Sequence, residues 1–151
     1  MLKGRGVAMF IPFRYNDGGR SEAGYVGKAG DCSTRSISIA TGIPYQDVYD
    51  QLNALCKTNR TSRVQRDSAR NGVGMPVIHR YMKSLGWQWT PTMQIGSGCR
   101  VHLAPEELPS GRLVVRVSKH LVAVIDGVIH DTSDCSRAGT RCVYGYWQPA
   151  P

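Results

Sequence analysis

The sequence contains no long hydrophobic run, and this absence excludes several kinds of protein. The longest apolar run near the N-terminus covers residues 7–11 and stops at Pro12. So short a run can form neither the core of a signal peptide nor a membrane span. We therefore predict a cytoplasmic protein that has no membrane partner.

Cysteine pairs at metal-binding spacing are also missing. The five cysteines are Cys32, Cys56, Cys99, Cys135 and Cys142, an odd number without a C-x-x-C pair. A chain with this pattern and no export signal is expected to keep its thiols free. His130 could join cysteines 99, 135 and 142 in a zinc site, but no pair among them has zinc-finger spacing. We expect no metal and no cofactor, and a Cys135–Cys142 disulfide only in an oxidising compartment.

Acidic residues are scarce, at 11 against 19 Lys and Arg, so the net charge is +8. Much of the excess lies in a basic stripe at helical spacing, formed by Lys57, Arg60, Arg63, Arg66 and Arg70. The stripe predicts weak binding of nucleic acid or of an acidic protein. The alternative is a solvated basic segment, because residues 58–62 are rich in poor helix formers. Aromatic side chains do not interleave with the arginines, so a base-stacking platform is not indicated.

The composition that remains is typical of one globular domain spanning residues 1–151. Hydrophobic residues make up 41% and charged residues 20% of the chain, and neither repeats nor low-complexity tracts interrupt it. The 17 glycines predict many turns. The chain is long enough to bury one sizeable core.

Apolar periodicity and turn residues predict helices in the first half and strands in the second. Helices are expected at 32–41, ended by Gly42, at 44–55, and at 75–85, with Pro76 near its start and Gly86 after its end. Strands are expected at 7–15, where Pro12 indicates an edge, and at 87–90, 112–118, 120–125, 128–131 and 141–147. We therefore predict an α+β fold with helices packed on a C-terminal antiparallel sheet.

Three residues in this arrangement form a candidate catalytic set. Cys32 begins the first helix, where the helix N–H groups lower a thiol pKa, and a neighbouring imidazole lowers it further. His120 begins one strand and Asp131 ends the next, and the Asp126-Gly127 turn between these strands predicts a hairpin. The hairpin places His120 beside Asp131, which would orient the imidazole.

Two alternatives exist for the partners of Cys32. His130 competes with His120, but it immediately precedes Asp131 on a strand and therefore faces the opposite side of the sheet. Asp134 is a reserve for the acidic member.

The segments around these residues resemble the papain-like cysteine peptidase superfamily. The resemblance lies in residues 30–32 before a helix, and in residues 119–124 and 129–132 on strands. More narrowly, the chain is similar to a group of bacterial and phage proteins marked by YNDGGR at 15–20, GDC at 30–32 and YGYW at 144–147. The resemblance implies a papain-like fold and a Cys-His-Asp site. It does not imply a substrate, because the superfamily includes peptidases, isopeptidases, amidases, acyltransferases and inactive relatives.

One part that papain-like enzymes commonly have is missing. They carry a glutamine upstream of the cysteine as an oxyanion donor, whereas this chain has no glutamine before Cys32. The backbone N–H of Cys32 could supply one donor, with Asn16 or Lys28 as the second.

Two functions follow as hypotheses. The first is a small cysteine hydrolase acting on an amide or isopeptide bond of a protein or peptide, with Cys32 as nucleophile, His120 as acid–base and Asp131 as orienting residue. The second is a non-enzymatic binding module, such as a phage inhibitor, that uses Arg60, Arg63, Arg66 and Arg70 to hold nucleic acid or an acidic protein.

Overall fold

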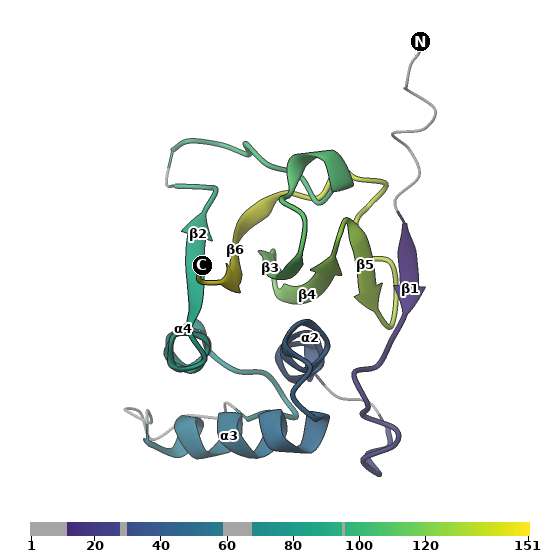
Figure 1. The fold of residues 1–151 in the computed structure, drawn as a ribbon, viewed down its shortest axis with the longest axis vertical. Helices are drawn as coiled ribbons and strands as arrows, with labels where there is room; N and C mark the ends of the chain where they lie inside the picture. The colour runs from purple at the N-terminus through teal and green to yellow at the C-terminus, as the bar shows by residue number, and fades with distance from the viewer. Residues whose placement is uncertain (1–11, 28–29, 59–67, 95) are drawn as a thin grey trace.

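A computed structural model describes residues 12–27, 30–58, 68–94 and 96–151 (Figure 1). The chain forms an α+β fold, as predicted. The helices are α2 (Cys32–Thr41), α3 (Tyr45–Thr58), α4 (Met75–Ser84) and the short 3₁₀ helix η1 (Pro105–Glu107). The strands are β1 (Phe13–Tyr15), β2 (Trp87–Pro91), β3 (Arg112–Val117), β4 (His120–Ile125), β5 (Val128–Asp131) and β6 (Val143–Pro149).

The strands form one sheet in the order β1-β5-β4-β3-β6-β2. All neighbours are antiparallel except β1, which pairs with β5 in parallel. The prediction of an antiparallel sheet was wrong at this edge. The helices and three strands separate β1 from β5 along the chain, so no hairpin turn forces them to run in opposite directions. The edge position indicated by Pro12 is confirmed.

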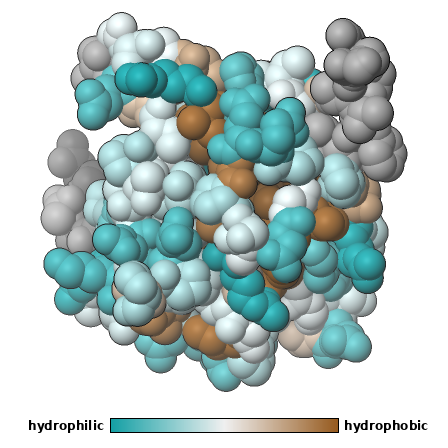
Figure 2. Space-filling model, turned by 45° about the horizontal axis from the view of Figure 1, so that its top comes forward, coloured by the Kyte–Doolittle hydropathy of each residue, from teal (hydrophilic) through white to brown (hydrophobic). Residues whose placement is uncertain are grey.

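Apolar side chains gather on both faces of the sheet. On one face, α2, α3 and α4 pack with residues such as Val114, Leu121 and Trp147 (Figure 1). The opposite face carries Val115 and Val122 and is covered by residues 101–108. Figure 2 shows hydrophilic side chains over much of the surface, with smaller hydrophobic patches between them. Burial of two clusters therefore holds the central strands between two layers.

The central helix α2 is short, polar and fixed at both ends. Its residues Ile37 and Ala40 are fully buried against the sheet. Gly42 ends the helix with a φ of 80°, a left-handed conformation that favours glycine, and its N–H donates to the Ser38 carbonyl at 2.9 Å. Because α2 is buried between the sheet and α3, the position of Cys32 at its start is well defined.

A disulfide joins Cys99 to Cys142, whose Cα atoms are 5.7 Å apart. The expectation of free thiols at these positions was wrong, and the partner of Cys142 is not Cys135, which stays free. Pairing of the chain around His102 with Cys142 brings the two cysteines together. Their separation of 43 residues gave no sign of this contact. None of the helices in the described part of the chain combines the length and apolar character needed to cross a membrane.

Candidate active site

Cys32 lines a cleft at the start of α2. The cleft has a volume of about 560 Å³ and lies between the start of α2, residues 71–75 and the turn from β3 to β4. Gly30 allows the second wall to approach, because a Cβ atom at this position would lie 3.0 Å from the carbonyl oxygen of Asn71. Cys32 is half-buried in the cleft, so a small group can reach its thiol.

His120 and Asp131 lie together at one end of the sheet. The hairpin pairs Ile125 with Val128, so the first residue of β4 and the last of β5 end near each other. His120 Nε2 and Asp131 Oδ2 are 2.7 Å apart. Since this contact occupies Nε2, the ring leaves Nδ1 for the thiol of Cys32.

Hydrogen bonding at His120 shifts the pKa values of both partners in the expected directions. Burial would raise the pKa of Cys32. The hydrogen bond to His120 and the positive charge of His120 lower this pKa, and the Leu121 N–H and Arg35 lower it further. Burial opposes protonation of His120, yet bonds to Asp131, Cys135 and Cys32 raise the pKa of His120 to about 11. The contacts at His120 therefore shift the balance toward a thiolate–imidazolium pair, relative to an isolated cysteine and histidine.

Asp131 is held ionised behind the imidazole. Burial would raise its pKa, but His120, the Thr132 N–H and the Arg35 guanidinium lower it. The Thr132 N–H donates to Asp131 Oδ1 at 2.7 Å, and Arg35 Nη2 lies 3.3 Å from the same oxygen. An ionised carboxylate at this position fixes the tautomer and orientation of His120.

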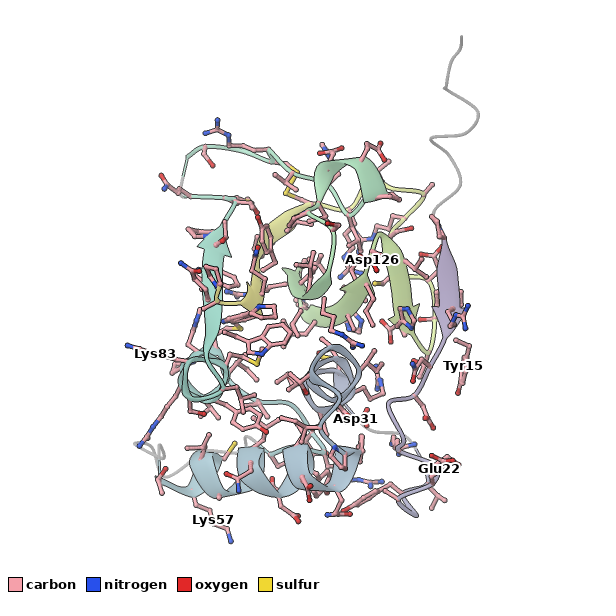
Figure 3. The ribbon with its side chains drawn as sticks, in the orientation of Figure 1. Tyr15, Glu22, Asp31, Lys57, Lys83 and Asp126 are labelled. Carbon is pink, nitrogen blue, oxygen red and sulfur yellow. A yellow bond between two sulfur atoms is a disulfide. The ribbon has the colours of Figure 1, made fainter. Side chains whose placement is uncertain are left out.

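A buried carboxylate, Asp31, organises the start of α2. It precedes Cys32 at the N-cap position but makes no side-chain cap to the helix. Its oxygens instead meet Arg35, Arg20 at 3.2 Å and the Tyr45 hydroxyl at 2.6 Å, between α2 and α3 (Figure 3). The Asp31 carboxylate therefore does not cap the N–H groups of the first helical turn, whose partial positive charge favours an anion near the start of α2.

His130 and Asp134, the alternative partners, lie elsewhere. His130 neighbours Arg14 across the β1–β5 pair, and its buried Nδ1 has no hydrogen-bond partner in the part of the chain described. Burial, Arg14 and Arg112 lower the pKa of His130. Asp134 is exposed, and its carboxylate accepts the N–H of Ser136 at 2.9 Å. Strand alternation therefore separated the two histidines correctly.

Of the two residues proposed from the sequence as second oxyanion donors, the structure describes only Asn16. Asn16 follows β1, where its backbone N–H donates to the Asp131 carbonyl and its side-chain oxygen accepts the N–H of Gly18 at 2.8 Å. It does not line the cleft. Lys28 lies outside the described residues. Asn71 lines the wall opposite α2 and carries a side-chain amide.

The basic stripe is largely outside the described residues, which include neither Arg60, Arg63 nor Arg66. Arg70 is described, and its guanidinium donates to the Val26 carbonyl at 3.1 Å. Helix α3 ends at Thr58, so a continuous helical stripe is not established.

A second thiol, Cys135, contacts His120 from the loop after β5. One ligand atom each from His120, Asp131 and Cys135 lie within 4.8 Å of one another, an arrangement that could hold a metal ion. A metal bound there would compete with the His120–Asp131 hydrogen bond. The zinc site considered from the sequence is not assembled, because the disulfide removes Cys99 and Cys142 as thiolate ligands.

Sequence reasoning missed the ion pairs around Asp31 and the contact of Cys135 with His120. One signal was present for the first: Arg35 lies four residues after Asp31, a spacing that places both on one side of a helix. No local signal indicated Cys135, since its position depends on how the loop after β5 folds back.

In comparisons with known proteins, no family model, no curated protein and no solved structure matches the chain. The chemistry available to the site therefore has to be inferred from its own geometry.

Proposed function

We propose that the protein is a small papain-like cysteine hydrolase that cleaves an amide or isopeptide bond in a protein or peptide. The observation that carries the proposal is the position of His120. Its imidazole hydrogen-bonds Asp131 at 2.7 Å and also hydrogen-bonds the Cys32 thiol, whose pKa is lowered although burial would raise it. A thiol made nucleophilic in an open cleft is typical of covalent catalysis.

The reaction has two steps, acylation of Cys32 and hydrolysis of the resulting thioester. The Cys32 thiolate attacks the carbonyl carbon, and the carbon–nitrogen bond breaks as His120 gives its proton to the leaving amine. His120 then takes a proton from water, which attacks the thioester, releases the acid and restores the Cys32 thiolate and the imidazolium. Asp131 stays ionised throughout and stabilises the charge on His120.

The negative oxygen formed in each step needs donors in the cleft. One candidate is the Cys32 N–H, which as the first N–H of α2 has no partner within the helix. We assign the second donor to the side-chain amide of Asn71 in the facing wall. Two such donors aimed at the oxygen are the usual solution in acyl transfer.

The experiment that tests the proposal is alkylation by iodoacetamide across pH, with each cysteine followed by mass spectrometry. Cys32 should react with an apparent pKa below about 8.5, the value of an unperturbed thiol. Cys56 is buried and provides an internal control. Peptidyl vinyl sulfones then test whether Cys32 is labelled as a nucleophile. Alkylation of Cys32 with an ordinary pKa would contradict the proposal.

The Cys99–Cys142 disulfide bears on where the protein acts. Cytoplasmic thiol pools keep most cysteines reduced, whereas oxidising compartments preserve disulfides. A cytoplasmic location stays a prediction from the sequence. Alkylation in intact cells, before lysis, distinguishes the cases, because the disulfide protects two cysteines from the reagent.

A further inference from the structure

A second hollow lies on the side of His120 away from the main cleft. It has a volume of about 430 Å³ and shares Lys119 and His120 with the cleft, but Cys32 does not line it. Its other walls come from Ser118 and from the loop after β5, including Cys135. The two spaces therefore meet at the residue that would protonate the leaving group.

Three cations line this hollow without a matching acid. They are Lys119, Arg137 and Arg141. In the described ranges, no carboxylate lies within 4.0 Å of any of them. Asp134 belongs to the same loop but does not line the hollow. Asp131 offsets the charge of His120, but the three cations leave the rim of the hollow net positive, which favours an anion there.

Arg141 is fixed in place by neutral acceptors. Its guanidinium donates to the carbonyl of Cys135 at 3.3 Å and to the carbonyl of Ser118. These bonds orient the group without neutralising it. A half-buried guanidinium held in this way presents a fixed positive charge, which suits planar anions such as carboxylates.

The other two cations, Lys119 and Arg137, have a backbone conformation that is uncommon for residues other than glycine. Lys119 has a φ of 56° and Arg137 a φ of 54°, both in the left-handed region. Glycine or asparagine would adopt this conformation at lower cost. Both residues line the hollow, Lys119 from the turn between β3 and β4 and Arg137 from the loop after β5.

We propose that this hollow binds a carboxylate carried by the leaving group of the substrate. The inference rests on the proposed function and names a substrate class for it. The acyl group stays bonded to Cys32 in the cleft, whereas the amine departs past His120, which gives it a proton. The hollow begins at His120 and excludes Cys32, so it receives the amine side. An acidic side chain on the first residue of the leaving fragment would meet Lys119, Arg137 and Arg141.

Matched substrates test the assignment. A peptide library is cleaved first, and the best sequence is remade with Glu or Gln at the first residue of the leaving fragment. The Glu substrate should have a kcat/KM about tenfold higher. Arg137→Gln and Lys119→Gln should remove most of this preference, whereas Arg80→Gln, an exposed cation on α4, should preserve it. Equal rates for Glu and Gln in the unmodified enzyme would overturn the inference and leave the hydrolase proposal intact.

Binding is measured separately from turnover. Succinate is titrated into the Cys32→Ala protein, with succinamide as its neutral counterpart, and backbone amide signals are followed by NMR. Succinate alone should shift the signals of Lys119, Ser133 and Arg137, and Arg137→Gln should abolish the shifts. Arg141→Gln is a less suitable variant, since Arg141 also holds two carbonyls.

The two proposals can fail independently. If succinate leaves these signals unchanged, the anion site is overturned whether or not Cys32 reacts. If succinate binds but Cys32 has an ordinary pKa and cleaves nothing, the hydrolase proposal fails and the leaving-group role fails with it.

Discussion

Two thiols contact the same imidazole, and their surroundings differ. Cys32 begins a helix, meets the Leu121 N–H and the field of Arg35, and opens into the cleft. Cys135 lies in a loop, on the hollow beyond His120, where its carbonyl accepts a hydrogen bond from Arg141. Both thiols have His120 as a neighbour, so this contact alone cannot decide which of the two is the better nucleophile. The two thiols differ in that Cys32 begins α2, where the positive end of a helix dipole lowers a thiol pKa, whereas Cys135 does not begin a helix.

Removing each thiol in turn is the most direct test of which one is required for hydrolysis. Cys32→Ala should reduce hydrolysis by at least about 10³-fold, because no other group can carry the acyl intermediate. Cys135→Ala should change the rate by no more than a few-fold. Turnover and thermal melting are measured on the same samples, since half-buried Cys32 loses little packing on shortening. The assignment is wrong if Cys32→Ala retains turnover with normal melting.

Removing the imidazole of His120 tests whether its charge lowers the pKa of Cys32. In the unmodified protein, alkylation of Cys32 should rise with pH through a pKa below about 8.5 and then stay level until His120 loses its proton near pH 11. In His120→Ala the burial of Cys32 remains without the compensating charge, so its pKa should rise and alkylation at pH 7 should fall.

His130→Ala is the matched control for this titration. His130 faces away from Asp131 and should leave the pKa of Cys32 nearly unchanged. The reverse ranking of the two variants would transfer the base role to His130.

Asn71, in the wall of the cleft that faces α2, is proposed as the second oxyanion donor, and its substitution tests that role. Asn71→Ala should lower kcat by about 10²-fold, the usual effect of losing one donor, with little change in Cys32 alkylation. Asn16→Ala serves as control, because Asn16 belongs to the turn after β1. A loss of alkylation in Asn71→Ala would indicate that the wall, and not the donor, has been disturbed.

The smallest effect is expected from the basic stripe. Replacing Arg60, Arg63, Arg66 and Arg70 by Gln should leave Cys32 reactivity unchanged and flatten the salt dependence of any DNA binding. Each duplex phosphate neutralised contributes about −0.9 to the log–log slope. Loss of hydrolysis in this variant would place the stripe in the substrate groove. Tight binding that persists at high salt would favour the binding-module hypothesis.

The parts of the fold that depend on local signals could be predicted. Gly42 marked the end of α2, and the Asp126-Gly127 turn set the hairpin that brings His120 to Asp131. Non-local contacts could not be predicted in this way. The parallel pairing of β1 and the Cys99–Cys142 disulfide join segments far apart in sequence. The same holds for Cys135, which reaches His120 only because its loop folds back.

Arg35 links motion of α2 relative to the sheet to the state of the Cys32 thiol. It belongs to α2 yet binds Asp31 at the helix start and Asp131 on β5, so one side chain ties the helical layer to the sheet. Any fluctuation that lifts α2 off the sheet must break the Arg35–Asp131 ion pair and separate Cys32 from His120 at the same time. The thiol would then lose its lowered pKa only in such open states. Hydrogen exchange of the α2 amides would report how often the two layers part.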